Sequence, residues 1–376
     1  MIRPDQRRKL AVIGPYPPYR GGIAHFTEQF HVNLESSGCA DVTGVSFSRQ
    51  YPGFLFPGKT QYAQDAVIQL NTQISIDSMN PMSWGKAARQ LIGLGVDEVV
   101  FMYWMPFFAP AFVRMANLLK KQGITVSAIV HNASPHERQP LGSFLSHAFL
   151  SRCDRLIALS KAVKRDMEAL GLRRPIDVNP HPVYNQFGTS IEKKEARHHL
   201  GLNETDALIL FFGLVRKYKG LDILIQALGQ TSRPVKLLVA GEWYEGQSEV
   251  DLMIKRLGLS DRIDIRDHYI SDSDVKYFFS AADVVVQPYR NATQSGVVQT
   301  ALQFGKPSIV TGVGGLPEMI EHGVSGWVVK PEDPKALAEA IDTFYEDDHA
   351  ERLTLGAIRA RDSFTWETFI SNFLKD

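Results

Sequence analysis

Short apolar runs rich in valine and isoleucine alternate along the chain with longer amphipathic stretches. An apolar run of about four to eight residues bounded by turn residues is typical of a buried strand. The longer stretches have the pattern of helices that cover a sheet. The alternation therefore predicts an α/β fold of repeated βα units with parallel sheets. The expected strands are residues 10–13, 42–47, 98–103, 125–130 and 155–158, followed by 208–212, 236–240, 263–265, 284–287 and 307–311.

A proline-containing connector separates these two sets of strands. Pro180 and Pro182 forbid a helix there and favour extended backbone. The 376 residues are enough for two domains that each bury a core. We therefore predict an N-terminal domain over residues 1–182 and a C-terminal domain over residues 183–356. Residues 357–376, rich in aromatic side chains, should form a helix that packs back on the first domain.

Composition narrows the class of protein. The 41 basic and 41 acidic residues cancel, which removes any global electrostatic case for a nucleic-acid partner. Cys39 and Cys153 are too few for a disulfide framework and lack metal-ligand spacing, so a reducing compartment is favoured. No signal peptide is expected, and the apolar run 99–113 contains Pro106 and Pro110 and is too short to span a membrane. We expect a cytoplasmic protein, with peripheral contact at the inner face of a membrane left open.

Residues 280–329 contain two glycine-bearing turns, each expected to follow a buried strand and to open a helix. The first turn leads into Ser295, and the second begins at Val313. Unpaired N–H groups at a helix start lie at the positive end of the helix macrodipole and favour anions. The two turns together predict a site for the phosphates of a nucleotide.

A second phosphate-site candidate, Gly53–Thr60, matches the P-loop pattern G-x-x-x-x-G-K-[ST] but fails on physical grounds. Pro57 has no N–H to offer a phosphate, and Phe54 begins a run of three bulky apolar side chains. We interpret the segment as an apolar surface loop, which could equally help to hold an acceptor with an apolar part.

Three cations follow the strand expected to end at Phe212. Arg216, Lys217 and Lys219 come just before a predicted helix at Leu221. The carboxyl ends of parallel strands are where open α/β sheets bind ligands, so two of these cations could neutralise a diphosphate. On this segment alone, a solvated helix start is an equally good interpretation.

These segments together resemble the family 4 retaining glycosyltransferases. The resemblance rests on the order of GPYPPYRGGIAHFT, VHN, NPHPVY, FGLVRKYKG, VAGE, SAADVVVQPY, FGKPSIVTGVGGLPE and GVSGWVV along nearly the whole chain. It implies the GT-B fold, in which two Rossmann-like domains with parallel sheets face each other across a cleft. It also implies a nucleotide diphosphate sugar as donor substrate on the second domain, an acceptor on the first, and neither a metal nor another cofactor.

The resemblance assigns roles to individual positions. Lys219 matches a family lysine that contacts the donor diphosphate, Arg216 lies close to a family arginine, and His131 matches a histidine near the transferred sugar. Gly21 and Gly22 match a turn that approaches the diphosphate, where a Cβ would obstruct the backbone. The donor-binding residues expected in the second domain are Gln294, Ser295, Gly296, Val297, Gln299 and Thr300.

The chain departs from its relatives at a motif of two glutamates separated by seven residues. Counting back from Gly305, the second position is Thr300 and the first lies near Ala292, with Gln294 the nearest polar residue. Thr300 or Gln299 could still bond ribose, and Gln294 a sugar hydroxyl, without a charge. The departure keeps two alternatives open, an inactive or weakly active nucleotide-binding relative and a nucleotide-sugar epimerase. A nicotinamide dehydrogenase is disfavoured because the first turn lacks the G-x-G-x-x-G spacing.

The favoured prediction is a metal-independent hexosyltransferase that moves a sugar, with retention, to a carbohydrate or lipid-linked acceptor in cell-surface polysaccharide or glycolipid synthesis. Its main catalytic requirement is to stabilise the leaving phosphate, by Arg216, Lys219 and the N–H groups of a helix start. The aromatic segment Tyr103–Phe112 could contact the acceptor, with core packing as the alternative. A solvated helix face is the safer interpretation of the basic residues Arg152, Arg155, Lys161, Lys164 and Arg165.

Overall fold

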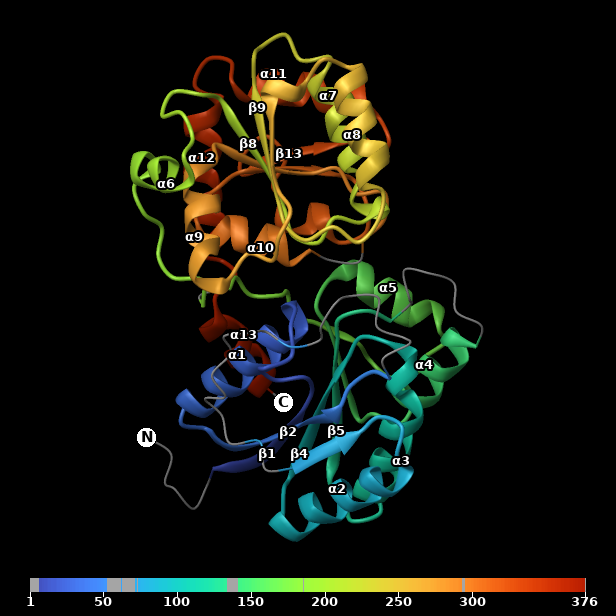
Figure 1. Cartoon of the computed structure of the whole chain (residues 1–376). Coiled ribbons are helices and arrows are strands. Elements are labelled where there is room, and N and C mark those ends of the chain that lie inside the picture. Colours follow the sequence, from blue (N-terminus) through green and yellow to red (C-terminus); the bar gives the residue numbers. More distant parts are fainter. Residues whose placement is uncertain are drawn as a thin grey trace. The chain divides into compact units, whose positions relative to one another are not determined.

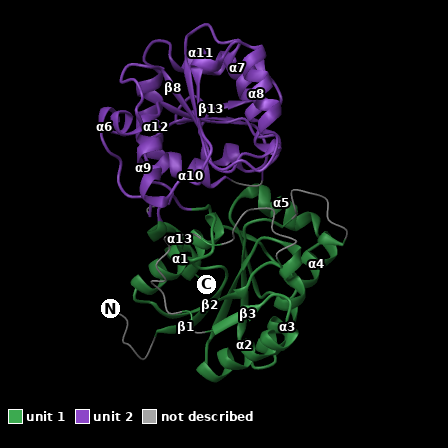
Figure 2. Cartoon of the chain, viewed as in Figure 1, with its two compact units in different colours: residues 1–181, 366–376 green, residues 182–365 purple. Residues whose placement is uncertain are grey.

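A computed structural model describes residues 7–52, 62, 72, 74–133, 141–184, 186–292 and 295–375. The chain forms two compact units (Figure 2). Unit 1 comprises residues 1–181 and 366–376, and unit 2 comprises residues 182–365. The chain thus enters unit 2 at the proline-containing connector and returns to unit 1 for its last helix.

Unit 1 is built on a seven-stranded parallel sheet in the order β3-β2-β1-β4-β5-β6-β7. Helices α1 and α13 lie on one face of the sheet, and α2, α3 and α4 lie on the other (Figure 1). Cover on both faces explains why every residue of β4, and every residue of β5 after the first, is buried. The elements are β1 (Arg8–Ile13), α1 (Gly22–Ser36), β2 (Ala40–Arg49), β3 (Ile74–Asp77), α2 (Pro81–Leu94), β4 (Glu98–Tyr103), η3 (Pro106–Phe108), α3 (Ala109–Lys120), β5 (Thr125–Val130), α4 (Gly142–Leu150), β6 (Arg155–Ala158), α5 (Lys161–Ala169), β7 (Asp177–Val178) and α13 (Trp366–Leu374).

Unit 2 contains a six-stranded parallel sheet in the order β10-β9-β8-β11-β12-β13. Helices α7, α8 and α11 lie on one face, and α6, α9, α10 and α12 on the other (Figure 1). The elements are α6 (Lys193–Leu200), β8 (Leu208–Phe212), η4 (Lys217–Lys219), α7 (Leu221–Leu228), β9 (Lys236–Ala240), α8 (Gln247–Arg256), η5 (Ser260–Arg262), β10 (Ile263–Arg266), α9 (Asp272–Ala281), β11 (Val284–Gln287), α10 (Gly296–Gln303), β12 (Ser308–Thr311), η6 (Leu316–Met319), β13 (Gly326–Val329), α11 (Pro334–Phe344) and α12 (His349–Arg361).

The segment 357–376, expected as one helix, is the end of α12 followed by α13. Helix α12 stops because Ser363 and Phe364 donate backbone bonds back to Ala360 and Arg361, and the Phe364 carbonyl then accepts from the Val183 N–H at 2.8 Å. The expectation of a single helix is therefore wrong, and the break lets the chain leave unit 2 before α13 begins.

Helix α13 is held in unit 1 by rings and by backbone acceptors. Phe369 and Phe373 meet Phe30 of α1 edge to face, with centroids 6.1 and 5.0 Å away. The Arg155 guanidinium lies 5.1 Å from the Phe373 ring and donates to the Phe373 carbonyl at 2.7 Å. Arg155 also pairs with the buried carboxylate of Glu98 at 3.3 Å, so it is not part of a solvated basic face.

Candidate functional site

The cations that follow β8 stand beside a sharp backbone turn. Gly213 has a φ of +93°, and the chain then forms the single turn η4 before α7. The Lys219 side chain is 7% exposed, and a Cβ on Gly213 would stand 3.0 Å from its Nζ. Nζ also lies 5.6 Å from the centroid of the Tyr289 ring. A side chain at position 213 would therefore crowd the lysine ammonium.

The Lys219 ammonium has no hydrogen-bond or ion-pair partner within the described ranges. Burial, and then the positive charge of Arg216, lower the pKa of Lys219 to about 8. A buried cation without an acceptor is unfavourable, and an anionic ligand would relieve that cost. Lys219 is thus poised to receive an anion.

Two arginines nearby differ in their engagement. The half-buried Arg216 guanidinium lies 5.9 Å from the Tyr244 ring and forms no ion pair with the residues described here. Arg290 instead donates to both carboxylate oxygens of Asp222, at 2.8 and 2.6 Å, and to the Lys217 carbonyl at 2.8 Å. Arg290 therefore fastens η4 to α7, whereas Arg216 and Lys219 have no acidic partner among the described residues.

The start of α10 is joined to the carboxyl end of β11. Ser295 caps the helix, and its Oγ accepts from the Val297 N–H at 3.3 Å. The same hydroxyl donates to Gln287 Oε1 at 2.6 Å and lies 3.3 Å from the Tyr289 hydroxyl. The N–H of Gly296 has no acceptor in the part of the chain that is described. This first turn therefore keeps a backbone donor for an anion.

The residues expected near ribose and sugar have different environments. The Thr300 hydroxyl donates to the Gly296 carbonyl at 2.8 Å, while the buried Gln299 Oε1 has no hydrogen-bond partner in the described part of the chain. Gln294 lies outside the described residues. Gln287 was not expected at the site from the sequence, yet its Nε2 is buried and has no partner within the described ranges. The sequence feature that could have indicated Gln287 is a polar residue at the end of the apolar strand VVVQ.

The second glycine-bearing turn does not open a helix of the kind predicted. It leads into η6, a four-residue 3₁₀ turn, after which Ile320 is extended and the chain runs on to β13. A single 3₁₀ turn lacks the aligned peptides that create a helix macrodipole. The prediction of a second helix-start phosphate site is therefore wrong.

In unit 1, His131 follows β5 directly. Its N–H donates to the Tyr103 carbonyl at 2.8 Å, which continues the sheet ladder by one residue. The buried ring meets Phe26 edge to face at 4.7 Å and lies 6.5 Å from the His181 ring. Burial, and then His181, lower the pKa of His131 to about 3, and its Nε2 has no hydrogen-bond partner among the described residues. The imidazole is thus neutral near pH 7 and can make one further hydrogen bond.

Gly21 and Gly22 stand at the start of α1. Gly21 is the N-cap residue with a φ of +106°, and a Cβ there would meet no protein atom within 4 Å. Within unit 1, glycine is therefore required by the backbone conformation rather than by crowding from the protein. Gly22 is the first residue of the helix.

The aromatic segment Tyr103–Phe112 is mostly core. Phe108 and Phe112 are fully buried, and Trp104 donates from Nε1 to the Tyr51 hydroxyl at 2.7 Å. These contacts favour the packing interpretation over an acceptor surface. The P-loop-like segment Gly53–Thr60 lies outside the described residues.

Across the described ranges, no group of three or more His, Cys, Asp or Glu side chains could hold a metal ion. None of the helices within those ranges is long and apolar enough to cross a membrane.

Comparison with known proteins matches both units to glycosyltransferase families. Residues 20–186 match the model for Glycosyltransferase Family 4, and residues 192–359 match that for Glycosyl transferases group 1. The D-inositol 3-phosphate glycosyltransferase of Xylanimonas cellulosilytica is 33% identical over 178 residues, 46% of this chain and 42% of that protein. D-inositol 3-phosphate glycosyltransferase 1 of Catenulispora acidiphila is 29% identical over 241 residues, 60% of this chain and 57% of that protein. The matched segments thus span about half the length of these curated relatives.

Solved structures share the fold at low identity. Sucrose-phosphate synthase from Thermosynechococcus elongatus has a TM-score of 0.74 at 18% identity, over 98% of this chain and 97% of that chain. Anabaena HepE in complex with UDP and glucose has a TM-score of 0.73 at 18% identity, over 98% of both chains. Two Rossmann-like parallel sheets and these matches establish the GT-B fold. The chain therefore belongs to the family 4 glycosyltransferases.

Proposed function

We propose that the protein transfers a sugar, with retention of anomeric configuration, from a nucleotide diphosphate sugar to a carbohydrate or lipid-linked acceptor. The observation that carries this proposal is the buried Lys219 ammonium at the carboxyl edge of the unit 2 sheet, without an acceptor among the described residues. Family membership supplies the reaction class, and the complex of Anabaena HepE with UDP and glucose supports a nucleotide-sugar donor.

In this proposal, unit 2 stabilises the leaving group. Lys219 and Arg216 place positive charge on the diphosphate, and the Gly296 N–H donates to a phosphate oxygen. The negative charge that develops as the sugar departs is largest on that phosphate, so donors fixed in advance lower the barrier. The departing phosphate helps to deprotonate the acceptor, so the proposed reaction requires neither a metal ion nor a protein base.

Because this chain lacks the two family glutamates, uncharged side chains bind the nucleoside and the sugar in this proposal. Gln299 Oε1 is buried and has no partner among the residues that the structure describes, which suits it to accept from a ribose hydroxyl. The neutral His131 offers Nε2 to a hydroxyl of the transferred hexose. For Gly21 and Gly22 we keep the diphosphate-contacting role that the family resemblance implies. We propose a cytoplasmic reaction in cell-surface polysaccharide or glycolipid synthesis, and contact with the inner face of a membrane stays open.

The replacement of both family glutamates, by Ala292 and Thr300, favours two alternative functions. One is a nucleotide-binding relative with weak or no transferase activity. The other is a nucleotide-sugar epimerase, which would interconvert donors with no acceptor present.

A thermal-shift titration with UDP, GDP, ADP and their common sugars tests the donor site first. A nucleotide that binds only the native protein raises its melting temperature, by an amount that grows with ligand concentration over Kd. We expect one nucleotide series to raise it in the wild type and not in Lys219→Met. No shift with any nucleotide would contradict a donor site in this protein.

The preferred donor is then incubated with and without candidate glycan or lipid-linked acceptors, and products are followed by mass spectrometry. Acceptor-dependent release of the nucleoside diphosphate supports the transferase. A new nucleotide sugar without acceptor identifies an epimerase, and binding without any turnover identifies the inactive relative.

A further inference from the structure

A pocket of about 410 Å³ opens in unit 1 where α4 and α5 end, at the amino edge of the sheet. Its polar lining comes from His147, Ser151, Arg173 and Arg174, and three leucines and a glycine supply the rest. No lining side chain is acidic. The proposed donor site lies at the carboxyl ends of the unit 2 strands. This pocket lies at the amino ends of the unit 1 strands and is therefore a separate site.

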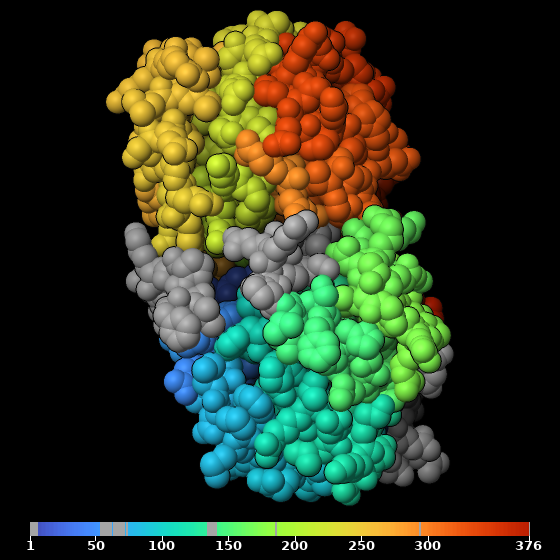
Figure 3. Space-filling model, turned by 90° about the vertical axis from the view of Figure 1, so that its right-hand side faces the viewer, coloured from blue at the N-terminus to red at the C-terminus, as the bar shows by residue number. Residues whose placement is uncertain are grey.

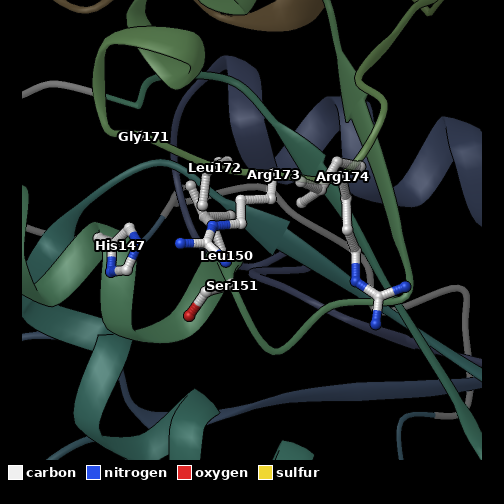
Figure 4. A pocket seen from close by; sticks show the side chains of 8 residues that line it. His147, Leu150, Ser151, Gly171, Leu172, Arg173 and Arg174 are labelled. Carbon is white, nitrogen blue, oxygen red and sulfur yellow. The ribbon is translucent and has the colours of Figure 1, made fainter.

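The two arginines of the pocket point in different directions. Arg173 turns toward His147 and Ser151, whereas Arg174 extends away from them (Figure 4). Arg174 pairs with Asp154 at 3.7 Å. In the described part of the chain, Arg173 and the His147 ring have no hydrogen-bond or ion-pair partner. The Ser151 hydroxyl reaches only the Ala148 carbonyl at 3.5 Å, a weak bond that leaves it available to a ligand.

An arginine near a helix end often serves the last carbonyls of that helix. At the end of α4, however, Arg152 donates to the Ala148 carbonyl. Backbone N–H groups of Ser151, Arg152 and Cys153 donate to the carbonyls of residues 147, 149 and 150. The end of α4 is therefore already satisfied, and carbonyl capping does not account for the position of the Arg173 guanidinium.

We propose that this pocket binds the phosphate group of a phosphomonoester ligand. A guanidinium donates two parallel hydrogen bonds to a phosphate, and the Ser151 hydroxyl and the His147 ring supply further donors. The leucines contact the apolar part of the ligand, and the volume fits a small molecule. Neither the proposed reaction nor the donor site uses any of these residues.

The phosphate could belong to a soluble metabolite or to a lipid headgroup. Phe144, 68% exposed, lies one turn before His147 on the same side of α4. Helices α4 and α5 lie on an exposed face of unit 1 (green in Figure 3), which either source could reach. Both sources present the same phosphomonoester chemistry to Arg173.

Hydrogen–deuterium exchange of the full chain separates the two sources and locates binding. One arm titrates glycerol 3-phosphate, and the other adds phosphatidylcholine vesicles containing phosphatidic acid. We expect protection of peptides that cover residues 142–151 and 170–175 in at least one arm. Protection by vesicles alone assigns the lipid, and protection by glycerol 3-phosphate assigns a soluble ligand. No protection of these peptides in either arm would overturn the proposal.

Arg173→Gln should weaken this binding about tenfold, because it removes a charge-assisted bond to the phosphate. Arg165→Gln is the matched control, since this exposed arginine of α5 does not line the pocket, and it should change binding less than about twofold. Equal effects of the two variants would count against the proposal. Both positions are exposed, so neither variant should lower the unfolding midpoint. Should Arg173→Gln lower it, Arg173→Lys, which keeps the charge but loses the fork, supplies the same comparison.

Discussion

Two buried lysines lie at opposite ends of the strands of the unit 2 sheet, and among the described residues only one of them has hydrogen-bond acceptors. We call these two sides of the sheet its amino edge and its carboxyl edge. Lys306 stands at the amino edge, just before β12, and donates to the carbonyls of Ser280 at 3.1 Å and Ala282 at 2.8 Å. Lys219 stands beyond the carboxyl end of β8 and donates to none of the described residues. Burial lowers the pKa of each lysine to about 8. A perturbed pKa therefore does not separate a structural lysine from a ligand-binding one, whereas the presence of an acceptor does.

The edges of the unit 1 sheet differ in the same way. Glu98, fully buried at the amino end of β4, accepts from Arg8 at 2.6 Å and from Arg155 at 3.3 Å. The Ser127 hydroxyl donates to it as well. His131, at the carboxyl end of β5, keeps an unpartnered Nε2. Lys306 and Glu98, at the amino ends of their strands, are thus engaged in holding the fold, whereas Lys219 and His131, beyond the carboxyl ends, each keep a group for a ligand.

The largest effect that the comparison predicts is on donor turnover. Lys219→Met should lower kcat/KM for the donor about 100- to 1000-fold, because it removes a charge that stabilises the leaving phosphate. Its unfolding free energy should stay level or rise, because the variant removes a buried charge that has no acceptor. Initial-rate kinetics and urea denaturation measure the two quantities.

Lys306→Met is the matched control. It leaves two buried carbonyls without their donor, so we expect a loss of about 1 kcal/mol of unfolding free energy. Donor kcat/KM should change less than about threefold. Equal losses of turnover in the two lysine variants would break the comparison.

The interior of the fold could be predicted from the sequence because buried parallel strands read as unbroken apolar runs. The predicted strands at 98–103 and 236–240 coincide with β4 and β9. Among the described residues, three strands were missed, namely β3, β7 and β13. Each lies at an edge of its sheet, where strands are short and half-exposed and give a weaker apolar signal.

The candidate site could be predicted only in part. Lys219 and His131 were found because each follows a strand, and strand ends are visible in the apolar pattern. Whether either side chain has a hydrogen-bond partner depends on long-range contacts, and the hydrophobic periodicity of the sequence does not reveal these. The bond from Ser295 to Gln287, for example, crosses a loop of seven residues, and that between Arg155 and Glu98 joins positions 57 apart.

The next effect in size concerns stability at the amino edge of unit 1. Glu98→Gln should lower the unfolding free energy by about 2 kcal/mol, since two arginines lose their carboxylate and both are partly exposed. Donor turnover should stay within about twofold of the wild type. Urea denaturation and initial rates again supply the measurements.

His131→Gln gives the opposite pattern at the carboxyl edge, with turnover lowered and stability at pH 7 little changed. Because the pKa of His131 falls from 6.5 to about 3 on folding, the wild type loses stability as the pH falls through that window. The variant should lose less over the same range. A turnover loss in Glu98→Gln as large as that in His131→Gln would contradict the division between the edges.

A pH titration tests whether the Lys219 charge is used by the ligand. Nucleoside diphosphate affinity should fall as the pH rises through about 8, by at most about tenfold per pH unit, because one proton leaves the ammonium. Lys219→Arg should flatten this dependence, since arginine stays charged.

The stability of the unliganded protein should change with pH in the opposite direction to the ligand affinity. The pKa of Lys219 is lowered from 10.5, so unfolding free energy rises with pH between about 8 and 10.5. Calorimetric titration between pH 7 and 9 measures the affinity, and an unchanged slope in Lys219→Arg would remove Lys219 from the diphosphate.

The smallest predicted effect is a change in donor KM that depends on which end of α10 loses a hydrogen bond. Gln287→Leu removes the acceptor that fixes the Ser295 hydroxyl, so the capping turn loosens and the Gly296 N–H is less well aimed. We expect donor KM to rise about fivefold, equivalent to about 1 kcal/mol, with a smaller change in kcat.

Gln303→Leu is the control, because it removes a comparable amide bond, to the Gly188 carbonyl at 2.8 Å, from the far end of the same helix. It should cost similar stability and leave donor KM unchanged. If both variants raise KM alike, helix stability rather than the placement of Ser295 controls donor binding. A rise in Gln287→Leu alone assigns Gln287 a positioning role that its burial and its place at the carboxyl edge already indicate.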